Sequence, residues 1–386
     1  MSRWYSYLNS AVSILNTYDG DEPLAAFLKK YFAQHKKYGS GDRKQIAHIC
    51  YGYFRLGKAM PQLPVEERVV AGLFLNSTTK HPLLELVKPE WNEKTGWPIE
   101  KKYSVLNNDI SINEVFPWED ECSEGIDQNK FCESFFIQPD LFLRLRPGKA
   151  QQVKNKLGNG NVEYKEVTDT CLALPNASKV DELLRLNEEV VVQDYSSQQT
   201  GTLLAGLNPG RVWDCCAASG GKSIMAWDVL PPIELTVSDK RESIISNLKK
   251  RFREAGIDRY QSSVIDLSIE QKRSASGGEY PLIIADVPCT GSGTWSRTPE
   301  QLFYFEKNRI DEYASLQKKI MMNVVPCLQT GGHLLYITCS VFKKENEEMV
   351  EFLQQQFSLA IIEKKLLKGY TMKADTMFAA LLRKEG

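Results

Sequence analysis

Two cysteines that each follow a short apolar run are the groups in this sequence best suited to covalent chemistry. Cys289 ends the segment Asp-Val-Pro-Cys, and Cys339 is the centre of a Thr-Cys-Ser tripeptide. The apolar runs at residues 281–284 and 334–337 predict buried strands just before them. Ligands of open α/β sheets bind at the carboxyl ends of parallel strands, so we expect both thiols to face one pocket. A thiolate in that pocket could attack an electron-poor carbon ring.

The remaining cysteines indicate neither a disulfide framework nor a zinc site. The chain has nine cysteines and four histidines, without a Cys-x-x-Cys pair or histidines at zinc spacing. An odd number of thiols in a chain of this length is typical of reduced cysteines in the cytosol. A disulfide between Cys289 and Cys339 is an alternative that would block their chemistry. We expect the following to fill the core: Cys50, Cys171, Cys215 and Cys327.

Composition indicates a globular protein of two or three domains, because 386 residues can form that many cores. The net charge of −1 excludes a uniformly basic chain, so any RNA contact must come from local basic clusters. No apolar run has the length of a membrane span, and the first residues are too polar for a secretory signal. We therefore expect a cytoplasmic protein without a metal and without a membrane partner.

The predicted secondary structure that would position the cysteines changes along the chain from helices to alternating strands and helices. Apolar residues at helical spacing indicate an all-α N-terminal domain, with helices at residues 22–32, 42–57 and 66–75. A small α+β module follows, with strands at residues 141–147, 162–167 and 190–192 and a helix at residues 150–157. From residue 193 onward strands alternate with helices, which is typical of a doubly wound sheet.

A glycine-rich turn between the first strand of that sheet, residues 211–214, and the next helix is a candidate cofactor site. Glycine lets a ligand approach the backbone, and the helix N-terminus offers free N–H groups. The spacing fits neither the P-loop nor the three-glycine dinucleotide motif, and a tight turn that serves packing is the alternative. The members of the turn are Cys216, Ala217, Ala218, Gly220, Gly221 and Lys222.

Three acids at successive strand ends favour the cofactor site over a packing turn. Asp239, Asp266 and Asp286 follow the second, third and fourth predicted strands. A carboxylate in such a position can accept hydrogen bonds from ribose hydroxyls. Together with the glycine-rich turn, the acids describe a pocket for a nucleoside without a phosphate chain, which suits S-adenosylmethionine.

These motifs resemble the RNA cytosine-5 methyltransferases of the Nop/Sun type, among them the bacterial ribosomal RNA small subunit methyltransferase B kind. The resemblance extends from residue 139 to the end of the sequence, and the combination of Pro-Cys with Thr-Cys-Ser is specific to that family. One departure is Ser219, where the family usually has proline; serine permits the same turn. The resemblance also includes Gln198, Arg297, Pro299, Gln317 and the segment at residues 374–381, which is similar to the family's final strand.

The resemblance implies a Rossmann-like S-adenosylmethionine-dependent methyltransferase domain and assigns roles by position. The glycine-rich turn would hold the methionine part of the cofactor, Asp239 its ribose and Asp266 its adenine. Cys339 would be the nucleophile that adds to carbon 6 of cytosine, and Cys289 would help to release the product. Asp286 would hydrogen-bond the base near nitrogen 3. Covalent addition of this kind divides one hard step into two easier ones.

Local basic clusters are the candidate RNA contacts. Arg144 and Arg146, with Lys149, form one cluster in the small module, and solvated charge is the alternative for both clusters. Trp295 and Arg297, just after the Cys289 loop, could stack on or clamp a flipped nucleotide, and a core position is the alternative for Trp295. The second cluster contains Lys249, Lys250, Arg251, Arg253 and Arg259.

The full interpretation is a Rossmann-like α/β methyltransferase domain at residues 191–386. A small α+β RNA-binding module at residues 129–190 and a helical domain at residues 1–128, which resembles the NusB-like RNA-binding domain, precede it. The leading hypothesis is methyl transfer to carbon 5 of a cytosine in ribosomal RNA by a monomer. Two alternatives are a DNA cytosine-5 methyltransferase, with the Pro-Cys cysteine as nucleophile, and a non-catalytic ribosome-assembly factor that binds RNA.

Overall fold

The computed structural model describes residues 2–106, 111–270 and 278–386, and the chain divides into two compact units. The first unit contains Met1–Asp120, Ile126–Gln138 and Thr294–Lys307. The second contains Glu121–Gly125, Pro139–Gly293 and Asn308–Gly386. Glu121–Gly125 therefore belongs to the second unit and Thr294–Lys307 to the first, although each segment lies within the sequence range of the other unit. The domain boundaries at residues 128 and 190 stay a prediction.

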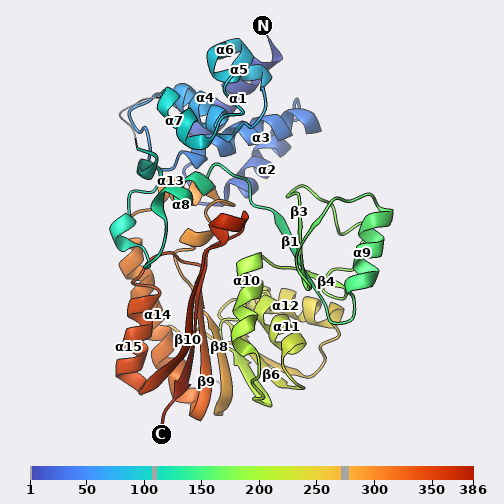
Figure 1. Ribbon diagram of the computed structural model, residues 1–386, viewed down its shortest axis with the longest axis vertical. Helices are drawn as coiled ribbons and strands as arrows, with labels where there is room; N and C mark the ends of the chain where they lie inside the picture. The colour runs from blue at the N-terminus through green and yellow to red at the C-terminus, as the bar shows by residue number, and fades with distance from the viewer. Residues whose placement is uncertain (1, 107–110, 271–277) are drawn as a thin grey trace. The chain divides into compact units, whose positions relative to one another are not determined.

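The first unit is helical, as predicted for the N-terminal region (Figure 1). The helix predicted at residues 42–57 begins earlier, at Ser40, because Asp42 lies inside its first turn and accepts a 2.8 Å hydrogen bond from Gly39 N–H. The prediction omitted α1. The helices are α1 (Arg3–Thr17), α2 (Leu24–Gln34), α3 (Ser40–Arg55), α4 (Val65–Asn76), α5 (Pro82–Val87), α6 (Pro89–Asn92), α7 (Ile99–Leu106), α8 (Gln128–Ser134) and α13 (Pro299–Tyr304).

A small antiparallel sheet forms the first part of the second unit, in the strand order β2-β3-β1-β4. Helix α9 (Ala150–Asn159) packs its buried residues Val153 and Leu157 into the same core as Leu143 and Leu172. The prediction omitted β3, because all four of its residues are buried and show no alternation. The strands are β1 (Leu141–Leu145), β2 (Lys165–Thr168), β3 (Cys171–Leu174) and β4 (Val190–Val192).

The large sheet has seven strands in the order β10-β11-β9-β8-β5-β6-β7. Five neighbouring strands, from β9 to β7, run parallel, and β11 pairs antiparallel with both β9 and β10. This arrangement confirms the predicted doubly wound α/β fold. The strands are β5 (Arg211–Asp214), β6 (Glu234–Asp239), β7 (Tyr260–Val264), β8 (Tyr280–Asp286), β9 (Leu328–Thr338), β10 (Leu359–Leu367) and β11 (Met377–Lys384).

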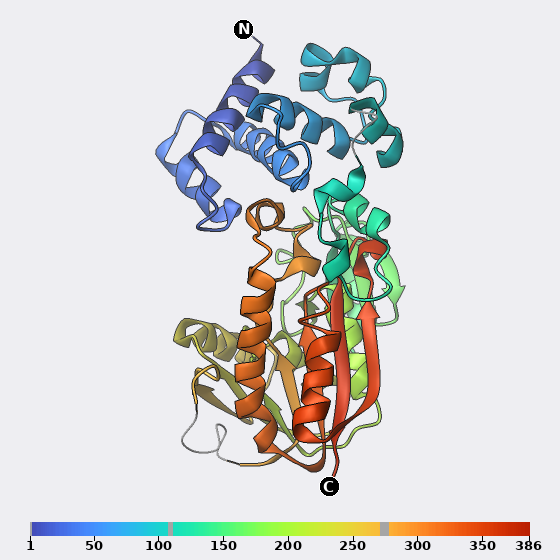
Figure 2. The same cartoon turned by 90° about the vertical axis from the view of Figure 1, so that its left-hand side faces the viewer.

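Helices cover both faces of the large sheet because its central strands are apolar on both sides. On one face Leu282 and Ile284 share a core with α11 (Gly221–Val229) and α12 (Glu242–Glu254). On the other face Ile283 packs with α14 (Arg309–Val324) and α15 (Glu347–Phe357) (Figures 1 and 2). No helix in the described part of the chain is long and apolar enough to cross a membrane.

The carboxyl ends of the parallel strands lie along one edge of the sheet, as predicted. Asp239 and Asp286 are the last residues of β6 and β8, Asp266 follows β7, and Cys339 follows β9. The prediction omitted β10 and placed the final strand at residues 374–381, whereas β11 begins at Met377.

A buried ion pair joins the small sheet to helix α11. Asp228, in the last turn of α11, lies 2.5 Å from Arg144 Nη1 and 2.8 Å from Arg146 Nε. The three side chains are at most 10% exposed. One carboxylate thus neutralises part of two buried positive charges, and its removal would leave both guanidinium groups without their anion.

We expect Asp228→Ala to lower the free energy of unfolding by about 3 kcal/mol or more, because breaking a buried pair leaves a desolvated charge. Urea denaturation followed by circular dichroism measures the change. Asp258→Ala, at an exposed position of the same unit, is the control and should change the free energy by less than about 0.5 kcal/mol. Equal urea midpoints for wild type and Asp228→Ala would contradict the role given to this ion pair.

We also expect the first unit to lose stability as the pH falls from about 6.5 to 4. His81 caps α5, since its Nδ1 accepts a 3.2 Å hydrogen bond from Leu83 N–H. Burial, together with the nearby His48, lowers the pKa of His81 to about 4. The unfolded state therefore binds a proton in this range that the folded state does not.

The measurement is the urea midpoint at several pH values, followed through the fluorescence of Trp4, whose ring centroid lies 5.0 Å from that of His81. His81→Asn keeps a capping side chain but cannot titrate, so its midpoint should fall less than that of wild type between pH 6.5 and 4. Identical pH dependence of the two proteins would show that His81 does not cause the loss.

Candidate active site

A cavity of about 470 Å³ opens at the carboxyl edge of the large sheet. Its lining comes from the loops after five parallel strands, which is where ligands of such sheets bind. The structure therefore brings together both predicted catalytic cysteines and the three strand-end acids. The predicted residues that line this cavity are Cys216, Ala218, Asp239, Asp266, Asp286, Cys289 and Cys339.

The glycine-rich turn after β5 has a backbone that few residues could adopt. Gly220 has φ of +83°, and a Cβ atom there would lie 2.7 Å from Phe252 of α12. Ala218 also has positive φ and lines the cavity, while α11 begins at Gly221. The turn can therefore offer backbone groups and the start of a helix to a ligand.

Ser219, the departure from the family pattern, has a partner of its own in this turn. Arg251 Nη1 donates hydrogen bonds to its carbonyl oxygen at 2.9 Å and to its Oγ at 2.8 Å. The serine hydroxyl therefore helps to fix the turn against α12. Arg251, predicted to bind RNA, is occupied by this contact and by a 3.0 Å bond to Asn187 Oδ1.

The acids after β6 and β7 accept hydrogen bonds from their own loops. Asp239 Oδ1 accepts from the backbone and Nε of Arg241 at 3.0 and 3.1 Å, and the Asp239 side chain is 8% exposed. Asp266 Oδ1 accepts from Ser268 N–H and Oγ–H, which lowers the pKa of Asp266. Both acids are therefore fixed as hydrogen-bond acceptors on the cavity wall.

Lys222 pairs with Asp286. Its Nζ lies 3.0 Å from Asp286 Oδ2 and donates a 2.6 Å hydrogen bond to Ser197 Oγ. Sequence reasoning assigned Lys222 to the cofactor, and that assignment stays a prediction. The observed ion pair gives Lys222 a further contact, because its nearly buried ammonium holds one oxygen of the Asp286 carboxylate in place.

The two thiols touch each other. Cys289 Sγ and Cys339 Sγ are 3.2 Å apart, and both side chains are half-buried. The contact with Cys339, together with burial, raises the pKa of the Cys289 thiol well above its usual range. Either sulfur can be the donor in this contact, so the two thiols form one hydrogen-bonded pair.

Sequence reasoning did not identify Glu345, a fully buried acid behind the two cysteines. Its carboxylate accepts hydrogen bonds from Thr290, next to Cys289, and from Ser340, next to Cys339. The sequence places Glu345 at the start of a predicted helix, where acids are usually solvated. The helix begins two residues later, at Glu347, and no sequence pattern shows that Glu345 turns inward.

The structure corrects most of the predicted RNA contacts. Arg144 and Arg146 are buried and paired with Asp228, so their charge is not available at the surface. Trp295 is 1% exposed and packs in the first unit, so its ring offers no face to a nucleotide. Arg297 is half-buried in the same unit, while Lys249 is exposed on α12 and stays a candidate. The rings that pack on Trp295 are Phe116, Trp118 and Phe305.

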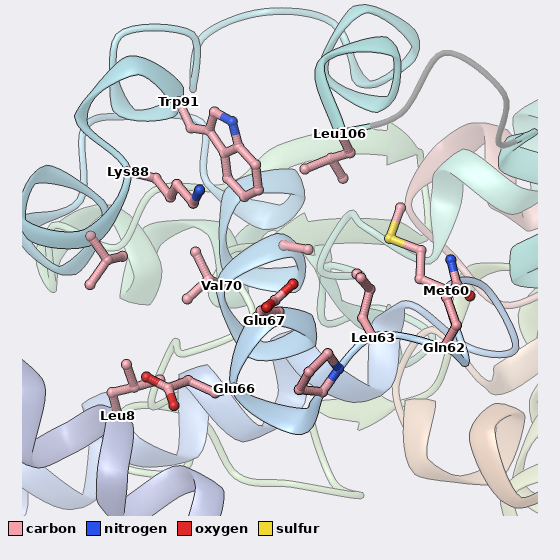
Figure 3. A pocket seen from close by; sticks show the side chains of 13 residues that line it. Leu8, Met60, Gln62, Leu63, Glu66, Glu67, Val70, Lys88, Trp91 and Leu106 are labelled. Carbon is pink, nitrogen blue, oxygen red and sulfur yellow. The ribbon is translucent and has the colours of Figure 1, made fainter.

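The first unit contains another cavity, of about 530 Å³ (Figure 3). Trp91 and Lys88 line it together with Leu106, Val70 and Glu67. The described residues of its lining include no cysteine, whereas Cys289 and Cys339 lie in the second unit. Over residues 2–106, 111–270 and 278–386 no three His, Cys, Asp or Glu side chains are grouped to hold a metal ion.

Comparisons with known proteins agree with this geometry. Residues 201–382 match the family model described as 16S rRNA methyltransferase RsmB/F. The ribosomal RNA small subunit methyltransferase B of Xanthomonas campestris pv. campestris is 31% identical over 276 residues, which cover 69% of this chain and 59% of that protein. This chain thus spans less than two thirds of the length of that relative.

Two solved structures share the fold. The crystal structure of PH0851 matches with a TM-score of 0.70 and 20% identity over 100% of both chains. NSun6 from Pyrococcus horikoshii matches with a TM-score of 0.59 and 14% identity over 67% of this chain and 94% of that one. The family match agrees with S-adenosylmethionine as the predicted cofactor. Residues 201–382, just under half of the chain, are thus similar to the 16S rRNA methyltransferases of the RsmB/F family.

Proposed function

We propose that the protein transfers a methyl group from S-adenosylmethionine to carbon 5 of a cytosine in RNA, with ribosomal RNA as the substrate class. The observation that carries the proposal is the pair of thiols 3.2 Å apart in one cavity with Asp286. The family description and the name of the Xanthomonas relative support ribosomal RNA. NSun6 was solved with SFG, an S-adenosylmethionine analogue, which supports the place of the cofactor in this fold.

Cys339 would begin the reaction, as the resemblance of its Thr-Cys-Ser segment to the family implies, once its thiol has given its proton to solvent. The thiolate adds to carbon 6 of the cytosine, and the electron pair of the 5,6 double bond becomes available at carbon 5. A proton from solvent reaches nitrogen 3 as charge builds on the ring, and the carboxylate of Asp286 accepts the resulting N–H hydrogen bond. S-Adenosylmethionine supplies the methyl group that carbon 5 takes. Asp239 and Asp266 would hold its ribose and adenine.

Cys289 would then help to release the product. After the addition, Cys339 is a thioether and no longer a thiolate, so the strongest cause of the raised pKa of Cys289 is gone. Cys289 can lose its proton to solvent and then take the proton from carbon 5. The electron pair of that C–H bond restores the 5,6 double bond, and the C6–S bond breaks as Cys339 leaves as a thiolate. Nitrogen 3 then returns its proton to solvent.

In the DNA methyltransferase alternative the Pro-Cys cysteine, Cys289, attacks. The Thr-Cys-Ser segment around Cys339 weighs against this alternative. A non-catalytic assembly factor would not need the two thiols in contact. Lys249, with Lys250 and Arg253, is exposed on α12 and would contact RNA phosphates. A monomer in the cytoplasm stays our prediction.

Replacing the two cysteines separately should cause two different failures. We expect Cys339→Ala to lower methyl transfer by at least about a thousandfold, because no thiolate can add to carbon 6. We expect Cys289→Ala to accumulate a covalent protein–RNA adduct, because carbon 5 keeps its proton. Tritiated S-adenosylmethionine with ribosomal RNA measures the first effect, and denaturing gel electrophoresis measures the second.

Cys327→Ala, a buried cysteine of the same unit, is the control and should transfer methyl groups without forming an adduct. Full activity of Cys339→Ala would show that the nucleophile is assigned wrongly. Labelling of DNA in place of RNA would favour the DNA alternative, and labelling of neither would favour the assembly factor.

Removal of Asp239 should weaken the binding of S-adenosylmethionine. Loss of a carboxylate that accepts ribose hydrogen bonds costs about 1.5–3 kcal/mol, or roughly a tenfold to hundredfold rise in Kd for Asp239→Ala. Arg241→Ala is the matched variant, because Arg241 occupies both oxygens of Asp239 in the free protein. It should leave the affinity unchanged or increase it. Isothermal titration calorimetry measures both, and equal affinities of wild type and Asp239→Ala would contradict the ribose role.

A further inference from the structure

Glu345 is a buried carboxylate to which both cysteine loops are hydrogen-bonded. Oε1 accepts from Thr290 N–H at 2.8 Å and from Gln317 Nε2 at 3.3 Å. Oε2 accepts from Thr290 Oγ1 at 2.6 Å and from Ser340 Oγ. The side chain is 0% exposed, so its interactions are with protein groups and not with bulk water.

Four donors surround the carboxylate of Glu345. A carboxylate has about four lone-pair sites, and these donors can occupy them. Burial raises the pKa of Glu345, and the hydrogen bonds from Ser340 and Thr290 oppose that rise. The partners therefore favour the ionised acid more than burial alone would.

The same contacts fix the distance between the two thiols. Thr290 directly follows Cys289, and Ser340 directly follows Cys339, so one carboxylate holds the residue next to each thiol. Gln317 of α14 supports the arrangement from a third side, because its Nε2 also donates a 3.0 Å hydrogen bond to Pro288 O. Tyr336 donates to Gln317 Oε1 at 3.1 Å and to the Glu345 carbonyl at 2.7 Å.

The charge of Glu345 also acts on Cys289. The causes that raise the pKa of Cys289 are its contact with Cys339, burial, and the negative charge of Glu345. A buried anion disfavours a second negative charge nearby, since the low polarity of the interior leaves the repulsion largely unscreened. Glu345 therefore opposes ionisation of Cys289.

We propose that Glu345 is a positioning residue: its carboxylate holds the two cysteine loops together and opposes a negative charge on Cys289. The proposal deepens the proposed function and rests on it for its catalytic meaning, because it concerns the two thiols that would act on the base. Other titratable and charged groups line the same cavity as Cys289 or act on its lining: Cys215, Cys216, Asp239, Lys240, Arg241, Asp266, Asp286 with Lys222, Tyr313, Tyr336 and Cys339.

The test measures cysteine alkylation in the full-length protein alone, without RNA or cofactor. Iodoacetamide pulses at pH 6 to 10, followed by peptide mass spectrometry, give separate rates for Cys289 and Cys339. In Glu345→Gln, which keeps the size of the side chain but removes the charge, we expect Cys289 to react about threefold faster or more at a given pH below its midpoint. Glu348→Gln, an exposed acid on α15, is the matched control and should react like wild type.

Thr290→Val separates the effect of the Glu345 charge from that of its hydrogen bonds. It removes one hydroxyl donor to Glu345 and keeps the carboxylate. Its Cys289 midpoint should stay near that of wild type, whereas Glu345→Gln should lower it. Unchanged Cys289 reactivity in a folded Glu345→Gln protein would overturn the proposal. If that variant does not fold, Ser340→Ala still decides: it removes a hydrogen bond to Glu345 beside Cys339 and should change the alkylation rate of Cys339, and a rate equal to that of wild type would overturn the proposal.

Alkylation also keeps this proposal separate from the proposed function. If Glu345→Gln changes the reactivity of Cys289 as expected but the protein labels no RNA, the role of Glu345 stands and RNA methylation is refuted. If the protein methylates RNA but Cys289 reacts equally with and without the Glu345 charge, RNA methylation stands and the role of Glu345 is refuted.

Discussion

The geometry of the site depends on the parallel pairing of β8 with β9. The register places Asp286 opposite Ile337, so the loops that carry Cys289 and Cys339 leave the sheet side by side. A slip of one residue would move one thiol by about 3.3 Å along the strand and turn its neighbours to the other face of the sheet. Backbone pairing thus brings the thiols near each other, and the hydrogen bonds of Glu345 set their final contact.

Much of this arrangement could be predicted because it follows from local patterns. Buried parallel strands appear as continuous apolar runs, and the polar residues that end them point to the ligand edge. Cys339, Asp239 and Asp286 could be found in that way. The strands β3 and β10 could not, since one is entirely apolar and short, and the other is an edge strand with mixed exposure.

The residues that sequence reasoning misassigned have interactions that depend on distant parts of the chain. Arg144 and Arg146 read as a surface cluster, but Asp228, more than eighty residues away, neutralises them inside the second unit. Glu345 is the opposite case, an acid expected in solvent that is held by donors from the Cys289 loop, from α14 and from its own loop. Charged residues alone do not reveal their partners, so burial of ions is the least predictable part of this site.

The last strand of the described chain, β11, has a consequence for synthesis. It lies between β9 and β10, and just before it Thr376 N–H bonds to Gly293 O at 2.8 Å. A side chain at Gly293 would bring its Cβ to 1.9 Å from Thr376 O, so the loop after Cys289 and the start of β11 close on each other without space between them. The ribosome therefore has to release Met377–Lys384 before the pair of thiols can assume its final geometry, and a nascent chain that lacks this strand carries both cysteines without a finished site.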